Sequence, residues 1–402
     1  RHAEKTLAKF VKGFGAVLVT GARQVGKTTL LREFGKDMHY VTLDNPVVLQ
    51  AATHEGGTFF KQHKSPLIID EIQYAPGLFP YIKMMIDNEK RKGLVLMSGS
   101  QQFRMMKNVS ESLAGRLAIL NLPDFSLREI QHIQFDKPFL PVPKYFSARS
   151  KHLQPLDYDE VWRIIQRGSM PALNSGQDIE RNDFYSTYTK TYIERDVRDL
   201  TQVGDERLFL QFLTVAAGRT GNLLNLSSLA NDVGISVSTA ERWLSILIAS
   251  NIVYVLRPFF VNVTKRMVKT PKIYFLDTGL AAFLTGWDTP QTLSTGAVAG
   301  AFFETFVVSQ IIKSYANAGI DPPLYFYRDR DGKEIDLVLW QNGLLHPLEI
   351  KKHANPSPGD ITAFAALEKI QDFKRGSGGV ICMYEDMLPL KGEDMIIPLN
   401  YI

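Results

Sequence analysis

The chain has 402 residues, of which 45% are hydrophobic and 22% charged, a composition typical of a folded globular protein and not of a low-complexity or disordered chain. This length exceeds one ordinary compact core and predicts two or three domains. The chain has 46 lysines and arginines and 42 acidic residues, which gives a net charge of +4. This charge is too small to indicate nucleic-acid binding by itself.

Cysteine content and apolar runs indicate the compartment. Cys382 is alone, which excludes an intrachain disulfide and suits a reducing environment. The longest apolar runs, such as residues 244–256, are broken by Ser245, Ser250 and Asn251 and fall short of a membrane span. The printed sequence shows no signal peptide. We therefore expect a cytoplasmic protein with no membrane partner.

The first motif is a phosphate-binding loop. Residues 16–20 (AVLVT) are apolar and β-branched, and GARQVGKTTLLREF follows at once, which predicts a strand, a loop of the pattern G-x-x-x-x-G-K-[ST] and a helix. Glycines let the loop amides point at phosphates, and the helix that begins near Lys27 adds its positive end. We expect Lys27 to contact the β- and γ-phosphates of ATP and Thr28 to bind Mg²⁺. The expected nucleotide-binding residues are Gly21, Ala22, Arg23, Gln24, Val25, Gly26, Lys27, Thr28 and Thr29.

Residues 66–71 (PLIIDE) form an apolar run that ends in two carboxylates. This pattern predicts a buried parallel strand that delivers acids to its C-terminal edge, where ligands bind in open α/β sheets. We expect Asp70 to hold Mg²⁺ through water, and Glu71 to orient or deprotonate the attacking water. The alternative for Glu71 is a charge at the start of a helix.

Two further strands are predicted in this region. Residues 40–43 (YVTL) lie between the loop and the acidic strand, so that the two phosphate-site strands are not successive in the chain. Residues 93–97 lead into Ser98-Gly99-Ser100, where a polar side chain can sense the γ-phosphate. We expect Ser100 to be that sensor, the alternative being a plain turn at the strand end.

Residues 1 to about 130 resemble the AAA-type P-loop ATPases that carry GxRQVGKTT, an apolar-DEIQ strand and a TGS-like sensor. These stand here as GARQVGKTT, LIIDEIQ and SGS, and the family's Ala-Gly-Arg step is matched by Ala114, Gly115 and Arg116. The resemblance implies that Arg116 stabilises the charge of a γ-phosphate, in its own chain or in a neighbouring subunit. The alternative is an arginine that pairs locally with a carboxylate.

The middle of the chain is predicted to be helical. Residues 123–155 are rich in Pro, Phe and basic residues, which indicates a boundary near Pro123. Residues 156–220 predict helices with an apolar stripe that includes Tyr188, Tyr192 and Val197. The charged run at 192–200 (YIERDVRDL) is either a contact for the ATPase domain or a solvated face.

Residues 225–260 predict a helix-turn-helix followed by two strands, as in a winged helix. Ser227 can cap the first helix, Gly234 fits the turn, and Ser236 can cap a second helix that runs to about Ser250. The outward positions of the second helix would include Ser238, Thr239, Glu241 and Arg242, a weakly basic surface for a DNA reader.

The segment after this helix is basic. It contains Arg257, Lys265, Arg266, Lys269 and Lys272 and no acid, which suits contacts to DNA phosphates. Winged helices also dock proteins, so that DNA and a protein partner stay open as alternatives.

The last third opens with an apolar helix over residues 300–316, in which Glu304 shares a face with apolar residues and needs a cation if it is buried. Three strands are predicted at 325–328, 333–340 and 344–352, then a helix at 360–370 and a strand at 379–384. Asp336 lies in the second of these strands. Glu349 and Lys351 lie two apart in the third and project from the same face.

This α-β-β-β-α-β order with E…D…E-x-K resembles the restriction-endonuclease-like fold of the PD-(D/E)xK nucleases over roughly residues 295–390. The resemblance implies that Asp336 and Glu349 bind one or two Mg²⁺ ions, that Glu304 completes or supports the metal site, and that Lys351 positions water or neutralises developing charge. Ile335 stands where the family pattern has proline. The alternative is structural pairing, with Lys351 bridging Glu349 and Asp336 without metal.

The whole chain resembles a prokaryotic family with an AAA-type P-loop ATPase domain (1–130), a helical linker and winged-helix domain (131–294) and a PD-(D/E)xK nuclease-like domain (295–402). The expected fold class is α/β, with a parallel P-loop sheet, a helical winged-helix middle and an α/β restriction-endonuclease-like end. We expect Mg²⁺-dependent ATP hydrolysis by a DNA-associated protein with a Mg²⁺-dependent nuclease-like domain. The alternative is a nucleotide-dependent protein-interaction switch with an inert nuclease-like domain, and an oligomer is compatible with both.

Overall fold

The computed structural model describes residues 1–99, 113–192, 206–260 and 269–402. The chain divides into two compact units. Unit 1 comprises Arg1–Phe125 with Ala249–Asn251 and Tyr315–Ile320, and unit 2 comprises Ser126–Ile248, Ile252–Ser314 and Asp321–Ile402. The first segment of unit 1 therefore ends close to Pro123, and the regions expected as a winged-helix domain and a nuclease-like domain lie together in unit 2.

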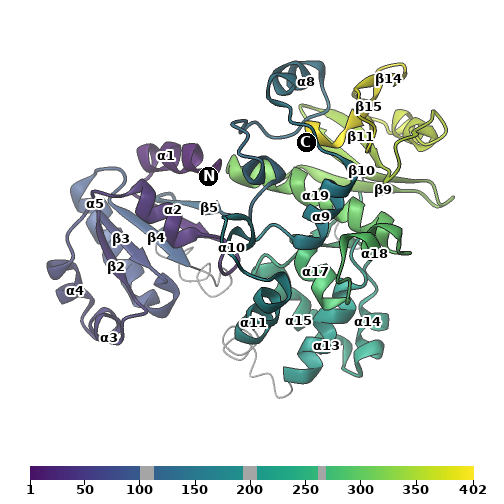
Figure 1. The fold of residues 1–402 in the computed structure, drawn as a ribbon. Coiled ribbons are helices and arrows are strands. Elements are labelled where there is room, and N and C mark those ends of the chain that lie inside the picture. The colour runs from purple at the N-terminus through teal and green to yellow at the C-terminus, as the bar shows by residue number, and fades with distance from the viewer. Residues whose placement is uncertain (100–112, 193–205, 261–268) are drawn as a thin grey trace. The chain divides into compact units, whose positions relative to one another are not determined.

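Unit 1 is built on a parallel sheet with the strand order β2-β3-β4-β1-β5 (Figure 1, purple to blue). Its strands are β1 (Ala16–Thr20), β2 (His39–Thr42), β3 (Leu67–Asp70), β4 (Val95–Gly99) and β5 (Leu117–Asn121). Its helices are α1 (Ala3–Gly13), α2 (Lys27–Phe34), α3 (Pro46–His54), α4 (Gly56–Gln62) and α5 (Phe79–Glu89), with 3-10 turns η1 (Ile72–Tyr74) and η2 (Pro76–Leu78).

The three inner strands of unit 1, β1, β3 and β4, are buried along their length. Every residue of β1 is buried. Ala16 and Leu18 join the core made with β3, β4 and α5, whereas Val17 and Val19 point to the other face, since side chains alternate along a strand. Continuous hydrophobic runs are the pattern of such doubly covered parallel strands. The strands expected at the phosphate site are confirmed, and β4 lies between β1 and β3.

Unit 2 begins with a helical region. Its helices are α7 (Leu127–Ile130), α8 (Pro143–Arg149), α9 (Tyr158–Arg167), α10 (Pro171–Asn174), α11 (Arg181–Tyr192), α13 (Glu206–Ala217), α14 (Leu226–Val233), α15 (Val237–Ala249), α17 (Thr278–Leu284) and α18 (Pro290–Thr295), with the 3-10 turn η3 (Ser150–His152). A small antiparallel sheet has the order β6-β8-β7, formed by β6 (Asn222–Leu223), β7 (Val253–Leu256) and β8 (Lys272–Phe275). Val197, nearly all of the charged run after Tyr192, Lys265 and Arg266 lie outside the described residues.

Helices α14 and α15 and strands β7 and β8 follow in the order that the sequence predicts. Gly234 ends α14 in the left-handed conformation with φ 77°, and the Ser236 hydroxyl accepts the Thr239 amide at 3.1 Å. The prediction that Ser227 caps α14 is wrong. The Asn225 side chain is the cap and accepts the Ser228 amide at 2.9 Å, because Ser227 already lies inside the first helical turn and a cap must precede it.

The rest of unit 2 packs a long helix, α19 (Ala299–Asn317), with a mixed sheet of order β14-β15-β13-β11-β10-β9 (Figure 1, green to yellow). The helix belongs to unit 2 up to Ser314. Its strands are β9 (Leu324–Arg328), β10 (Glu334–Gln341), β11 (Leu344–Ile350), β12 (Lys374–Arg375), β13 (Gly379–Cys382), β14 (Leu388–Lys391) and β15 (Asp394–Pro398), and the chain ends in the 3-10 turn η6 (Leu399–Tyr401). Strands β9, β10 and β11 pair antiparallel, whereas β11, β13 and β15 pair parallel. Strands β12, β14 and β15 were not predicted from the sequence.

The helix expected over residues 360–370 is a 3-10 helix, η5 (Thr362–Lys369). The buried residues Phe364 and Leu367 of η5 follow Ile361, which immediately precedes it, at every third position. That spacing stacks side chains on one face of a 3-10 helix but drifts around an α-helix. Among the described residues, no helix is long and apolar enough to cross a membrane.

Candidate functional site

The loop between β1 and α2 carries the residues expected to hold phosphate. Gly26 has a φ of 91°, a backbone conformation that favours glycine. A Cβ added at Gly21 would overlap the carbonyl oxygen of Leu122. The buried Lys27 begins α2, and its ammonium donates to the carbonyl oxygens of Gly21 at 3.1 Å and Ala22 at 2.7 Å. Residues 22–25 lie in the loop and Thr29 lies in α2, and their contacts to nucleotide stay a prediction.

Asp70, at the C-terminal end of β3, is the centre of a hydroxyl cluster. Thr28 Oγ1 lies 2.9 and 3.1 Å from its two carboxylate oxygens, the Tyr40 hydroxyl donates at 2.9 Å, and the Ser98 hydroxyl also donates to it. Burial, together with the hydrogen bond to Asp70, raises the pKa of Tyr40 to about 12, so that Tyr40 stays a donor at neutral pH. The contacts of Tyr40 and Ser98 with Asp70 were not predicted from the sequence, although the SGS motif at the strand end was a signal for Ser98.

The neighbouring oxygens of Thr28 and Asp70 fit a magnesium ion. Mg²⁺ prefers hard oxygen ligands, and P-loop proteins hold it with a loop hydroxyl and a strand-end aspartate. Thr28 and Tyr40 also line a surface cavity of about 580 Å³, which keeps this position open to solvent. The arrangement therefore suits a nucleotide-bound metal.

Glu71 follows Asp70 in an uncommon backbone conformation. Its φ of 59° lies in the left-handed region, which non-glycine residues rarely occupy and which clusters at functional sites. The Glu71 amide donates to Ser98 Oγ at 3.1 Å, and its carboxylate accepts the side-chain amide of Gln73. The structure thus brings Glu71 to the strand end that carries Asp70, immediately before η1, and its role toward water stays a prediction.

The two other residues expected to act on the γ-phosphate have different outcomes. Ser100 lies outside the described residues. Arg116 pairs with Asp87 of α5, with Nε 2.6 Å from Oδ1 and Nη2 3.1 Å from Oδ2. Within this chain, Arg116 therefore has the local carboxylate partner that the sequence analysis considered as its alternative.

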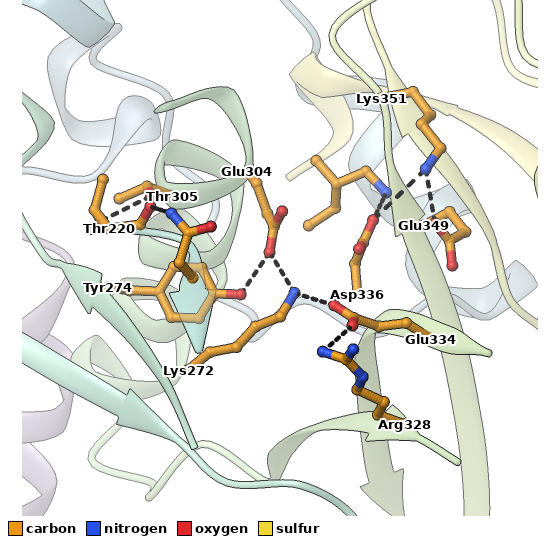
Figure 2. Close-up of polar contacts among 12 residues, drawn as sticks. Thr220, Lys272, Tyr274, Glu304, Thr305, Arg328, Glu334, Asp336, Glu349 and Lys351 are labelled. Atoms are coloured by element: carbon orange, nitrogen blue, oxygen red, sulfur yellow. Dashed lines mark hydrogen bonds and ion pairs between the residues drawn. The ribbon is translucent and has the colours of Figure 1, made fainter. Parts of the chain in front are cut away.

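A second candidate site lies in unit 2, where β10 and β11 bring Asp336, Glu349 and Lys351 together (Figure 2). Lys351 Nζ lies 2.9 Å from Glu349 Oε2 and 4.0 Å from Asp336 Oδ2. Asp336 Oδ2 also accepts the backbone amide of Ile350 at 2.9 Å. The pairing of β10 with β9 shifts register between Ile335 and Val338, and such irregularities re-aim side chains next to functional sites.

The side chains of this cluster perturb each other's protonation. Burial, followed by the charge of Asp336, raises the pKa of Glu349 to about 9. Burial alone would lower the pKa of Lys351, but the charges of Glu349 and Asp336 outweigh it and raise that pKa. Perturbed titratable groups that converge in this way indicate a functional site or a structural ion-pair network.

Glu304 projects from α19 toward β8 rather than lying free beside the other two acids. Its Oε1 accepts the Lys272 ammonium at 3.1 Å and the Tyr274 hydroxyl at 2.6 Å. Burial raises the pKa of Glu304, as does the charge of Asp336, whereas Lys272 and Tyr274 act in the opposite direction. The cation that a buried Glu304 requires is therefore Lys272.

The prediction that Lys272 faces solvent to contact DNA is wrong. Its side chain is 5% exposed, and its ammonium also lies 2.7 Å from Glu334 Oε1. Lys272 is the first residue of β8, which is the central strand of the small sheet. It is thus turned inward with its charge fully paired, whereas Lys269, just outside the strand, is exposed.

The residues of the second site fit a metal only in part. In the described parts of the chain, no group of three or more His, Cys, Asp or Glu side chains has the arrangement of a metal cluster. Asp336 and Glu349 both lie near the ammonium of Lys351. Glu304 instead pairs with the ammonium of Lys272. Two carboxylates therefore fit a divalent ion that displaces Lys351, and Glu304 does not complete the set.

Three family models match successive parts of the chain. One described as an AAA domain (AAA_14) matches residues 14–131. Two described as domains of unknown function match residues 158–291 (DUF8612) and 299–402 (DUF4143). The first match agrees with the geometry of the loop, the acidic strand and the parallel sheet of unit 1.

Relatives cover the full chain. The uncharacterized proteins Rv2008c of Mycobacterium tuberculosis and Mb2031c of Mycobacterium bovis are each 30% identical over 405 residues, which is 100% of this chain and 84% of the relative. The Walker-type ATPase PABY2304 of Pyrococcus abyssi, a solved structure, is 13% identical over 71% of this chain and 95% of that chain, with a TM-score of 0.45. The chain belongs to the family of the two mycobacterial proteins and contains an AAA-type P-loop ATPase domain.

Proposed function

We propose that the chain binds ATP with Mg²⁺ at the loop of unit 1 and hydrolyses it. The observation that carries this proposal is the position of Thr28 Oγ1, 2.9 Å from a carboxylate oxygen of Asp70 at the mouth of the phosphate loop. Thr28 and Asp70 would hold the ion, whose charge offsets that of the β- and γ-phosphates when it is bound.

The other residues of the site have separate tasks in this proposal. The Lys27 ammonium, which donates to two loop carbonyls, turns to the β- and γ-phosphates when nucleotide fills the loop. Glu71 orients the attacking water and accepts its proton. Ser98 donates to the Asp70 carboxylate and accepts the Glu71 amide, and so fixes the position of the metal-binding acid relative to the catalytic acid.

Two substitutions separate nucleotide binding from hydrolysis. Lys27→Ala should abolish turnover and weaken binding of a fluorescent ATP analogue. Glu71→Gln should retain binding and lower phosphate release by roughly 100-fold or more, the contribution of a positioned general base. Glu55→Gln is the matched control, because Glu55 is exposed between α3 and α4. Unchanged binding and turnover in Lys27→Ala would refute the proposal.

The second site supports a second candidate function, Mg²⁺-dependent cleavage of a phosphodiester. It is favoured by the convergence of Asp336, Glu349 and Lys351. Asp336 and Glu349 would hold the ion, and Lys351 would neutralise charge on the phosphate. The competing proposal is an inert domain in a nucleotide-dependent interaction switch, and the direct Lys351–Glu349 pair favours it.

Cleavage assays distinguish these two possibilities. The protein is incubated with supercoiled and single-stranded DNA in Mg²⁺ or Mn²⁺, with and without ATP, beside Asp336→Ala and Lys351→Ala. Cleavage that both substitutions abolish would support a nuclease. Intact ATPase activity without cleavage in any condition would support the interaction switch.

We further propose that α14, α15, β7 and β8 act as a winged helix that associates with DNA. The exposed Lys269 and the basic segment before it carry this proposal, since lysine and arginine supply the salt-dependent part of DNA affinity. Changing Lys265, Arg266 and Lys269 together to alanine should weaken DNA binding and flatten its dependence on salt. ATP-dependent retention of a protein partner without DNA binding would favour the switch instead.

A further inference from the structure

A buried ammonium occupies the side of the second site where Glu304 was expected to bind metal. Figure 2 shows the Lys272 side chain extended between the carboxylates of Glu304 and Glu334. Its ammonium nitrogen lies 3.1 Å from Glu304 Oε1 and 2.7 Å from Glu334 Oε1. The ammonium also lies 5.7 Å from the centre of the Phe326 ring. The side chain is 5% exposed, so that protein groups replace the water around this charge.

Glu304 and Glu334 are both engaged by cations of the chain itself. Glu304 Oε1 takes the Tyr274 hydroxyl at 2.6 Å in addition to Lys272. Glu334 Oε2 lies 3.5 Å from Arg328. Burial alone would lower the pKa of Lys272, but the charges of Glu304, Asp336 and Glu334 outweigh it and raise that pKa, so that the ammonium persists at neutral pH.

The position of Lys272 is built by backbone pairing between two parts of unit 2. The Phe259 amide donates to the carbonyl of Phe326 on β9 at 2.6 Å, and the Phe326 amide donates to the carbonyl of Arg257 at 3.1 Å. The chain after β7 is thereby joined to the sheet that carries Glu334 and Asp336. Lys272 lies within the segment matched at residues 158–291, whereas its two acids lie within 299–402.

We propose that Lys272 is a resident cation that takes the place of a metal ion at Glu304, so that a divalent ion at this site is held by Asp336 and Glu349 without Glu304. A divalent ion at Glu304 would face the Lys272 ammonium at close range, where like charges repel strongly in a partly buried site. The site is therefore composite, because residues 299–402 alone lack Lys272, the cation that pairs with Glu304 and Glu334.

This inference shares one assumption with the second candidate function, that Asp336 and Glu349 bind a divalent ion. It does not require that the site cleaves a phosphodiester. Its readout is metal binding by the full chain, measured as the loss of free Mn²⁺ in electron paramagnetic resonance without nucleotide. The Mn²⁺ binding that is lost in Asp336→Asn is assigned to the second site. Cleavage is not measured, so that an inert domain would leave the test unaffected.

Three variants decide the proposal. Lys272→Met should create or tighten the Mn²⁺ event by roughly tenfold, because it removes a nearby positive charge and releases Glu304 as a ligand. Lys272→Arg keeps the charge and should leave the affinity near that of the unchanged protein. Glu304→Gln should weaken the affinity by no more than roughly tenfold, because it removes a nearby negative charge but not a ligand.

Two results would overturn it. One is a Lys272→Met protein that folds but binds Mn²⁺ no better than the unchanged chain. The other is a Glu304→Gln protein that loses Mn²⁺ as completely as Asp336→Asn does. Tryptophan emission verifies folding, and if Lys272→Met does not fold, the Glu304→Gln comparison alone decides between the outcomes.

Discussion

Replacing Lys272 with methionine tests how much the buried charge network contributes to the stability of unit 2. Methionine retains an unbranched side chain of similar length but removes the ammonium. Among the described residues, Glu304, whose side chain is 16% exposed, then keeps the Tyr274 hydroxyl as its partner, and Glu334, 29% exposed, keeps Arg328. The variant therefore leaves negative charge in a setting that no longer balances it.

Breaking a buried ion pair by removing one partner costs about 3–5 kcal/mol of unfolding free energy. We expect the lower end, about 3 kcal/mol at neutral pH, because Glu334 is partly solvated and Glu304 can take up a proton. Burial already raises the pKa of Glu304, and losing Lys272 raises it further.

This proton uptake predicts the pH dependence of the defect. A carboxyl group whose pKa is raised in the folded protein contributes stability that is complete below its unfolded pKa of about 4.3. That contribution is lost as the pH rises through the folded pKa. The stability deficit of Lys272→Met relative to the unchanged protein should therefore be smaller at pH 5 than at pH 8.

Tryptophan fluorescence during urea unfolding measures this selectively. All four tryptophans, Trp162, Trp243, Trp287 and Trp340, lie in unit 2, so that unit 1 contributes no tryptophan signal. Because a chain of two units need not unfold in one step, the midpoints of the tryptophan transition are compared. Lys391→Met, at an exposed position on β14, is the control and should change stability by less than about 0.5 kcal/mol. Equal deficits at pH 5 and pH 8, or no deficit, would refute the reasoning.

Three further predictions follow from single contacts. Ser98→Ala should lower ATP turnover roughly tenfold with little change in binding, the equivalent of one hydrogen bond to Asp70; phosphate-release and binding assays check this. Gly168→Ala should destabilise unit 2 by roughly 2–4 kcal/mol, because φ is 86° and the added Cβ would overlap the Tyr185 hydroxyl, and an unchanged tryptophan midpoint would contradict it. Because burial raises the pKa of Glu349 to about 9, its contribution is complete below about pH 4.3 and lost as the pH rises through 9. The unchanged protein should therefore lose more stability toward pH 9 than Glu349→Gln, as thermal unfolding across pH will show.

The composite character of the second site bears on how the two regions of unknown function are studied. A fragment limited to residues 299–402 would lack Lys272 and Tyr274, the two donors that Glu304 accepts. It would still carry Glu304, Glu334, Asp336 and Glu349, with Lys351 beside Asp336 and Glu349 and Arg328 beside Glu334. Metal binding or cleavage by such a fragment would therefore differ from that of the intact chain.

Local features of the site followed from the sequence because each depends on residues close together in the chain. The spacing of Gly21, Gly26, Lys27 and Thr28 predicts a short loop that is followed directly by the start of a helix. Glu349 and Lys351 share a face because side chains alternate along a strand, and their 2.9 Å contact agrees. The apolar run before Asp70 predicted that this residue lies at the end of a buried strand, because buried parallel strands have continuous apolar sequences.

Only the tertiary structure decided which distant groups meet. Strand order places β4 between β1 and β3, and this brings Ser98 to Asp70. Lys272 looked like one more cation of a basic segment, because nothing in its immediate neighbours shows that β8 turns it toward Glu304. Local sequence patterns determine the backbone conformation and the face on which each side chain lies. The partner of a buried charge depends on how separate elements pack, so it is determined only when the whole unit folds.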